Sequence, residues 1–441
     1  MVRFLHIADI HLGYQQYGLS ERFDDFSRTF IDLVEEALRR EVDFVLLAGD
    51  LFHKRAVNPL AMRVAVAGLE TLQDANVPVL AVEGNHEKAY YRDQYSWLEF
   101  LDAMRYLQLL NPMFEKGKAV LVAHGEGGGA FVDVADGVRV YGLKYYGSST
   151  SKALASFADA LDAVDNSEVT YSILMMHAGL EGQLAHTGRL RMSDLAPLQE
   201  VIDYVALGHI HKPYRVNDWI FNPGSPESCS IQEAVMWPNR GALFVEVHPE
   251  VDPPHQVQTI VPTRRPFHRL TVEVDALTSP EAVYNHVDTL ISRKDAEILP
   301  EPAPVVDVLL TGILPFNRYE LDLNAIQDKV ERAWHPLTVR VRSQITPADF
   351  EVNVEAEASR GELEHSVIRQ LIERDQRYRA DAERWTEGAR RLKDLVLVGS
   401  VPPAIVDHLR HLREKVGDGI SDKHDPESAR EDAQEEAQEE A

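Results

Sequence analysis

The chain has 441 residues, a formal charge of -26 and an apolar content of 44%. This length exceeds one ordinary domain, and the apolar content is enough for a sizeable core, so we expect one large domain, one small domain and an extension. The acidity excludes a generally basic, nucleic-acid-attracting surface, although a local positive field at a metal site is sufficient to bind phosphate. The single cysteine, Cys229, excludes an intramolecular disulfide framework, and the N-terminal apolar run is too short for a signal peptide or membrane span, so we expect a cytoplasmic protein.

The first part of the chain alternates apolar strands with amphipathic helices, a pattern typical of a layered α/β domain. Strands are expected at 2–7, 42–48 and 77–82, and helices at 23–40, 59–74 and 93–107. From residue 119 the pattern predicts a second sheet, with strands at 119–123, 129–134, 138–143, 171–176 and 201–207, a helix at 153–163 and a closing strand at 242–248. The fold class is therefore α/β, with the large domain over 1–266.

Side chains that can bind metals follow five of these strands. They are Asp9 and His11, Asp50 and His53 in GDLFH, Asn85 and His86 in GNHE, His177, and His209 and His211 in GHIH. In an extended segment residues i and i+2 point the same way, so each of the Asp9/His11 and His209/His211 pairs is expected to aim two ligands at one place. Carboxylates, an amide oxygen and neutral imidazoles suit a borderline or hard divalent ion with more than four ligands.

Any one of the 18 histidines, taken alone, is better explained as a solvated or core residue. Chance does not readily explain five such motifs, because each of them directly follows a predicted apolar strand. At this point the sequence resembles the calcineurin-like metallophosphoesterases. It is most similar to one branch, the DNA double-strand-break repair nucleases of the SbcD and Mre-eleven type. The segments that carry the resemblance are HIADIHLGYQQYGLSERFDDF, GDLFH, GNHE, and LGHIHKP followed by NPGSPES.

The resemblance implies an α/β/β/α sandwich that holds two divalent metal ions. Mn²⁺ is the ion that the resemblance favours. One ion would be held by Asp9, His11 and His211, and the other by Asn85, His177 and His209. Asp50 would bridge the two. Two such ions activate a bridging water and stabilise the attacking and leaving oxygens of a phosphodiester.

Two further histidines receive catalytic roles from the resemblance. His86, next to a ligand, would be the general acid for the departing sugar oxygen or would stabilise the charge on the phosphorane. His53 would orient the substrate or support a ligand, although it is also explained as a residue that only hydrogen-bonds a loop.

The implied activity is manganese-dependent 3′→5′ exonuclease and single-strand endonuclease cleavage at DNA ends, by a homodimer associated with the nucleoid. The ligand motifs alone fit any member of the superfamily. The alternatives are a general or cyclic-nucleotide metallophosphodiesterase, and a DNA-end tether whose nuclease activity is incidental.

Residues 267–345 are expected to form a small α/β module. The pattern predicts strand, helix, strand, helix and strand at 268–274, 280–293, 305–310, 323–333 and 337–342. The resemblance makes this a capping domain that shapes the DNA groove, whereas the alternative is a lid without DNA contact, since the module is not strongly basic.

The region 346–416 is expected to be helical. One long helix is predicted over 361–398, with Leu371, Tyr378, Trp385 and Leu392 recurring every seven residues, and a second helix is predicted from Pro402. In the resembled family this region, about 361–416 here, binds the coiled-coil ATPase partner of the SbcC or Rad-fifty type. The acidic tail 417–441 is poor in apolar residues and is expected to be disordered.

Overall fold

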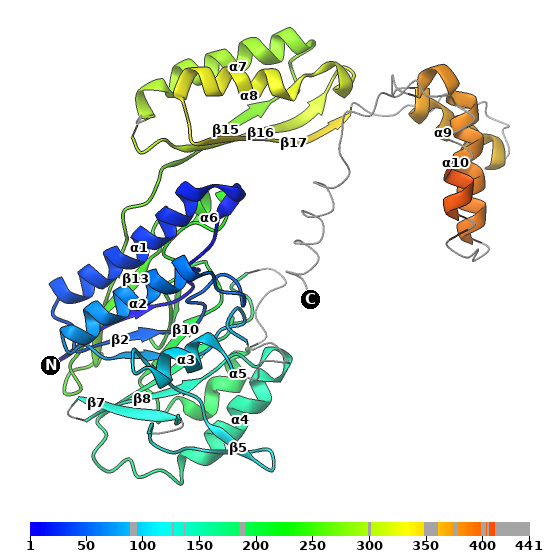
Figure 1. Ribbon diagram of the computed structural model, residues 1–441. Coiled ribbons are helices and arrows are strands. Elements are labelled where there is room, and N and C mark those ends of the chain that lie inside the picture. The colour runs from blue at the N-terminus through cyan, green and yellow to red at the C-terminus, as the bar shows by residue number, and fades with distance from the viewer. Residues whose placement is uncertain are drawn as a thin grey trace. The chain divides into compact units, whose positions relative to one another are not determined.

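The computed structural model describes residues 1–88, 95–125, 128–135, 137–184, 190–298, 301–347, 360–373, 378–397, 403 and 405–410. The chain divides into two compact units (Figure 1). The first unit comprises Met1–His268 and Glu301–Val305, and the rest belongs to the second. Among the described helices, none is long and apolar enough to cross a membrane.

Two six-stranded sheets form the centre of the first unit. The first sheet has the order β14-β13-β1-β2-β3-β4. Its strands are β1 (Val2–Ile7), β2 (Phe44–Leu47), β3 (Val79–Ala81), β4 (Gln108–Leu109), β13 (Ala242–Val247) and β14 (His255–Ile260). Strands β1 to β4 run parallel, and β13 pairs antiparallel with β1.

The second sheet has the order β11-β12-β10-β9-β8-β7. Its strands are β7 (Phe131–Ala135), β8 (Val138–Leu143), β9 (Tyr171–His177), β10 (Tyr204–Gly208), β11 (Tyr214–Val216) and β12 (Ile220–Asn222). Strands β8, β9, β10 and β12 are parallel neighbours, so their carboxyl ends lie along one edge.

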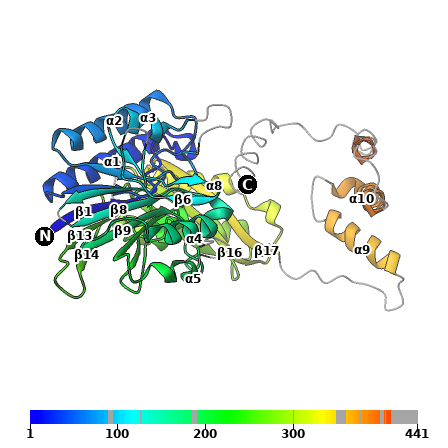
Figure 2. The ribbon, with the colours of Figure 1, turned by 90° about the horizontal axis from the view of Figure 1, so that it is seen from below.

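The two sheets pack face to face and helices cover both outer faces, as Figure 2 shows. On one side lie α1 (Ser20–Arg39), α2 (Pro59–Asp74) and α3 (Trp97–Ala103), and on the other lie α4 (Thr150–Leu161) and α5 (Met192–Leu195). Three separate apolar clusters fill the spaces between the four layers, and the one between the sheets includes Phe4, Phe44 and Ile173, all fully buried. The predicted α/β/β/α sandwich is confirmed.

Two predicted elements of this unit are wrong in extent or place. The helix expected at 93–107 is the short α3, because a capping box between Ser96 and Glu99 starts it and Arg105, with a φ of 63°, follows its end. The strand expected at 119–123 is β6 (Lys118–Val120), which pairs with β5 (Met113–Glu115) in a separate two-stranded sheet and not in the second sheet. The apolar stretch is short. Only Ala119 of this strand is buried, whereas Lys118 is exposed.

The α/β module of the second unit has the predicted order of elements. Strands β15 (Phe267–Glu273), β16 (Val305–Leu314) and β17 (Thr338–Pro347) form one sheet, and α7 (Pro280–Lys294) and α8 (Leu323–Trp334) lie together on one side of it (Figure 1). The two helices bury Val287 and Val330 against this sheet. Asp307, fully buried, accepts hydrogen bonds from Arg269 and Arg342 at 2.7 Å each, so one carboxylate pairs with two guanidinium groups within the module.

The long helix predicted over 361–398 is wrong. The described residues form α9 (Arg360–Glu373) and α10 (Ala382–Leu397), which lie side by side and are joined by a Lys393–Glu364 ion pair of 2.6 Å (Figure 1). Folding back buries Ala382 and Thr386, which a single helix would leave in water. Residues 405–410 are helical, as expected of the second helix, whereas its start at Pro402 and the tail 417–441 lie outside the described residues.

Large apolar side chains remain exposed on the first unit near α2 and α3. They are Leu60, Tyr95, Trp97, Phe100 and Met104, each at least 38% exposed. A homodimer through these helices stays a prediction.

Candidate metal centre

The predicted ligands come together where the carboxyl ends of both sheets meet. In the first sheet Ile7 is level with Leu47, and Leu47 with Ala81, so the loops after β1, β2 and β3 leave the same edge. In the second sheet Gly208 is level with His177, which places the ends of β9 and β10 side by side. Hydrogen bonds between the loops join the two edges, since the His209 N–H donates to both carboxylate oxygens of Asp9 at 3.0 and 3.1 Å.

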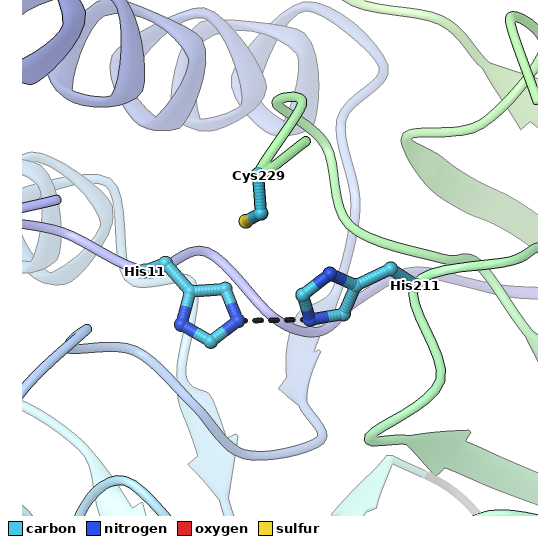
Figure 3. A group of neighbouring side chains, drawn as sticks. All are labelled: His11, His211 and Cys229. Carbon is cyan, nitrogen blue, oxygen red and sulfur yellow. Dashed lines mark hydrogen bonds between the residues drawn. The ribbon is translucent and has the colours of Figure 1, made fainter. Parts of the chain in front are cut away.

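One group of donors consists of Asp9, His11 and His211. The Nε2 atoms of His11 and His211 face each other at 3.0 Å (Figure 3). Asp9, His11 and Asp50 each place a donor atom within 4.8 Å of the others. Asp9 and His11 are buried, so this group is largely shielded from solvent.

A second group consists of Asn85, His177 and His209. The Asn85 Oδ1 atom lies 3.0 Å from His177 Nε2 and 3.0 Å from His209 Nδ1. The Asp50 carboxylate lies 3.3 Å from His177 Nε2, and it also belongs to the cluster with Asp9 and His11. Asp50 is therefore next to both groups of donors.

These distances fit ligands arranged around cations. Donors about 2.0–2.2 Å from one octahedral ion lie about 3 Å from each other. The fit is chemical as well as geometric, because the Nδ1–H group of His177 donates to the Ala48 carbonyl at 2.8 Å and leaves Nε2 facing two oxygen acceptors. When Nε2 is unprotonated, its lone pair faces two oxygens, an arrangement that a metal cation stabilises.

The electrostatics of the histidines agree with this. Burial lowers the pKa of His209 to about 3 and lowers the pKa of His11 well below its ordinary value, so both present neutral imidazoles. Burial also acts to lower the pKa of His177, but Asp50 outweighs it and raises the pKa to about 9. In the absence of a metal ion, a proton on His177 therefore compensates the charge of Asp50.

The backbone of the ligand loops differs from the predicted extended geometry. Asp9, His11 and Asp50 have φ values of 54°, 54° and 53°, and His209 has 86°, all in the left-handed region. Asp9 and His11 converge because of these turns and not because of strand pleating, whereas His209 and His211 contact different donor groups, which corrects the prediction that this second pair aims at one place. Such conformations are costly for residues with a Cβ atom and are concentrated at functional sites.

Three glycines leave room for the ligands to approach. A Cβ atom on Gly84 would lie 1.9 Å from Asp50 Oδ1, and one on Gly49 would lie 2.3 Å from His177 Nδ1. A Cβ atom on Gly208 would lie 2.2 Å from the Ala48 carbonyl oxygen. The glycines of GDLFH, GNHE and GHIH are therefore required by steric contact with the site itself.

Glu87, the last residue of GNHE, is a supporting residue that the sequence analysis did not assign. Its carboxylate accepts hydrogen bonds from the backbone N–H groups of Asp50, Phe52 and Gly84 at 2.9–3.0 Å. Burial and the nearby Asp50 raise its pKa to about 8, whereas the amide groups favour the carboxylate. Glu87 therefore fixes the Asp50 loop relative to the Asn85 loop.

Glu233, on α6 (Ile231–Met236), was also missed. Its Oε1 atom lies 3.1 Å from His211 Nδ1, and its Oε2 atom accepts the Cys229 N–H at 3.0 Å. Burial acts to lower the pKa of His211, but Glu233 raises it well above its ordinary value. A carboxylate on Nδ1 orients the ring and makes Nε2 a stronger ligand.

The two proposed catalytic histidines lie beside the first donor group. His86 places Nε2 3.9 Å from Asp50 Oδ2, and its Nδ1 contacts the His53 carbonyl oxygen. The His53 ring stacks on Tyr14 with a centroid distance of 3.9 Å, and its buried Nδ1 has no hydrogen-bond partner among the described residues. Burial, with a smaller contribution from His86, lowers the His53 pKa to about 3.

Comparison with known proteins agrees with this geometry. The family described as Calcineurin-like phosphoesterase matches residues 2–213, which contain every predicted ligand. A protein named DNA double-strand break repair protein Mre11 from Saccharolobus solfataricus is 27% identical over 344 residues, covering 75% of this chain and 83% of the relative. Residues 2–213 therefore form a calcineurin-like phosphoesterase domain, and the chain is similar to proteins named Mre11 over about three quarters of its length.

Other relatives bear the same printed name. The protein from Aeropyrum pernix is 28% identical, covering 72% of this chain and 75% of the relative. The protein from Archaeoglobus fulgidus is 33% identical, covering 53% of this chain and 52% of the relative. The similarity to the Archaeoglobus protein therefore spans about half of each chain.

Replacing Glu233 by Gln tests how His211 is supported. An amide would present N–H to either His211 Nδ1–H or the Cys229 N–H, so one hydrogen bond must be lost along with the negative charge. We expect one of the bound Mn²⁺ ions to be held about 10- to 100-fold more weakly, as measured by electron paramagnetic resonance titration. Glu36→Gln, on the outer surface of α1, is the matched control, and equal affinity in the two variants would contradict this role.

Proposed function

We propose that this chain is a metal-dependent DNA nuclease that processes DNA ends in double-strand-break repair. The observation that carries the proposal is the position of Asp50 next to two separate groups of metal donors. The mixture of carboxylate, amide and imidazole ligands suits Mn²⁺. The relatives are named as DNA double-strand break repair proteins, which supports DNA ends as the substrate.

The ligands Asp9, His11 and His211 would hold one ion, Asn85, His177 and His209 the other, and Asp50 both. When bound, such a pair of ions supplies an activated water and neutralises phosphate charge. The residues of the chain provide the remaining functions, which are orientation of the phosphodiester and protonation of the leaving group.

His86 is the candidate general acid. Its backbone N–H donates to Asp50 Oδ1 at 3.1 Å, which ties the residue to the centre. With Nδ1 directed at the His53 carbonyl, the proton for the departing sugar oxygen would be carried on Nε2, on a side chain that is 28% exposed. The resemblance to Mre11-type nucleases supports 3′→5′ exonuclease and single-strand endonuclease activity as part of this proposal.

His53 contributes both its backbone and its side chain to the proposed site. Its carbonyl oxygen holds the ring of His86 in one orientation, and its side chain is fixed by stacking on Tyr14. His53 would therefore act by orienting His86, whereas its own Nδ1 atom is buried and has no partner among the described residues.

The nuclease proposal is tested by degradation of a 3′-labelled DNA duplex with Mn²⁺. We expect His86→Ala to reduce cleavage by about 10²- to 10⁴-fold, because a general acid is lost, while the metal content is retained. His124→Ala is the matched control, since its imidazole contacts Asp102, near the end of α3, and not the ligands. Turnover of a small chromogenic diester without any DNA cleavage would support a general phosphodiesterase instead.

We also propose that the second unit adds a DNA groove and a partner site. The module over 267–345 would shape the groove, and about 361–416 would bind a coiled-coil ATPase. The support for the partner site is the set of exposed apolar residues on α9 and α10, which includes Leu371 at 54%, Val396 at 57% and Leu397 at 72% exposure. Such a surface is typical of a helix-in-groove interface.

Removal of residues 361–441 tests the partner site. We expect the shortened chain to lose co-purification with the ATPase but to keep metal-dependent cleavage of a simple diester. Leu371→Glu with Leu397→Glu should act in the same way, because a charge cannot enter an apolar interface. Unchanged co-purification of both variants would refute the assignment.

A further inference from the structure

Beside the first donor group lies a sulfur atom that the proposed reaction does not use. His11, His211 and Cys229 each place a donor atom within 4.8 Å of the others. Figure 3 shows the Cys229 side chain directed at the space next to the two facing imidazoles. His11 and His211 face each other at 3.0 Å, so the cysteine adds a third donor to a pair that is already convergent.

The position of Cys229 is fixed from both sides of its backbone. Its N–H donates to Glu233 Oε2 at 3.0 Å, and its carbonyl accepts from Gln16 Nε2 at 2.7 Å. Gln16 is buried and in turn accepts a hydrogen bond from Arg22 Nε at 2.9 Å. The guanidinium group of the fully buried Arg22 also binds Glu227 and the Ser228 carbonyl, which holds the same loop.

Glu233 connects the cysteine to the metal ligand. One oxygen of its carboxylate holds the His211 ring and the other holds the Cys229 backbone. The thiol and the imidazole are thus placed by one side chain, which is itself near Arg240 at 3.8 Å. The arrangement therefore keeps sulfur within reach of an ion bound to His11 and His211.

The third donor changes which ions the pair prefers. Thiolate and imidazole ligands favour Zn²⁺ and other thiophilic ions, whereas carboxylate and carbonyl oxygens suit Mg²⁺ and Mn²⁺. A set of one Cys and two His ligands matches zinc chemistry, and on binding the thiol proton is released to solvent. A Mn²⁺ ion at Asp9, His11 and His211 has little to gain from sulfur.

We propose that Cys229, with His11 and His211, forms a binding site for thiophilic divalent cations, represented by Zn²⁺ and Cd²⁺, which excludes the ion of the first donor group and inhibits the enzyme. This inference rests on the proposed function for its inhibitory consequence. The binding site itself does not depend on that function, because its three donors are defined by the structure alone.

The test is a Cd²⁺ titration of the full-length, metal-depleted chain, followed by the ultraviolet charge-transfer band of a cadmium thiolate. Cys229 is the only cysteine of the chain, so the band reports this residue alone. We expect a saturable band in the wild type and none in Cys229→Ser, with Cd²⁺ affinity at least about tenfold weaker in the variant by calorimetry. Excess Mn²⁺ should displace Cd²⁺ and remove the band, because the two ions share His11 and His211.

Two results would overturn the inference. The first is equal Cd²⁺ and Zn²⁺ affinity in the wild type and Cys229→Ser. The second is a band that Mn²⁺ does not compete with, which would mean that the thiol binds Cd²⁺ without the two histidines. Thermal unfolding of both proteins checks that the Ser variant is folded, and Cys229→Ala provides a second variant without a thiol.

Inhibition is measured separately from binding. We expect the Zn²⁺ concentration that halves Mn²⁺-dependent DNA cleavage to rise at least about tenfold in Cys229→Ser, with each protein compared to its own zinc-free activity. If neither protein cleaves DNA, the nuclease proposal fails while the Cd²⁺ titration still decides the metal site. If DNA is cleaved but the titration shows no dependence on Cys229, only the present inference fails.

Discussion

The main constraint on this structure is that several ionisable side chains lie close together in its buried interior. Asp9, Asp50 and His177 are almost fully buried where the two sheets meet, and the carboxylate of Asp50 contacts both donor groups. Buried charge is unfavourable unless it is paired, so these side chains require cations between them. The two-sheet architecture supplies the place, since the carboxyl ends of its parallel strands bring loops from distant parts of the sequence to one edge.

Holding the ligands there requires an unusual backbone. Four of the ligands lie in the left-handed region, and the glycines of three motifs admit contacts that no other residue would allow. The carboxylates of Glu87 and Glu233 accept hydrogen bonds from these loops and from His211 and so stabilise the turns. The centre is thus a rigid set of turns whose strain is balanced by neighbouring charged and polar groups. This rigidity also places Cys229 beside His11 and His211, where a spare sulfur donor affects which ions can bind.

Much of this could be predicted from the sequence because each ligand motif follows an apolar strand. The structure brings together all seven predicted ligands, and the elements of the module over 267–345 occur in the expected order. Glu233 could not be predicted, since it lies on a six-residue helix that is too short to show an amphipathic period, and it approaches His211 only through the fold. Glu87 stood within a recognised motif, but its role depends on hydrogen bonds to a loop that is distant in sequence. The long helix failed because periodicity cannot show where a chain folds back on itself.

The central claim is that Asp50 serves two metal ions at once. It is tested most directly by counting tightly bound Mn²⁺ per chain in the wild type, Asp50→Ala and His211→Ala, with circular dichroism to confirm that each is folded. The account predicts two ions for the wild type, loss of both in Asp50→Ala and weakening of mainly one in His211→Ala. Two tightly held ions in a folded Asp50→Ala chain would contradict it.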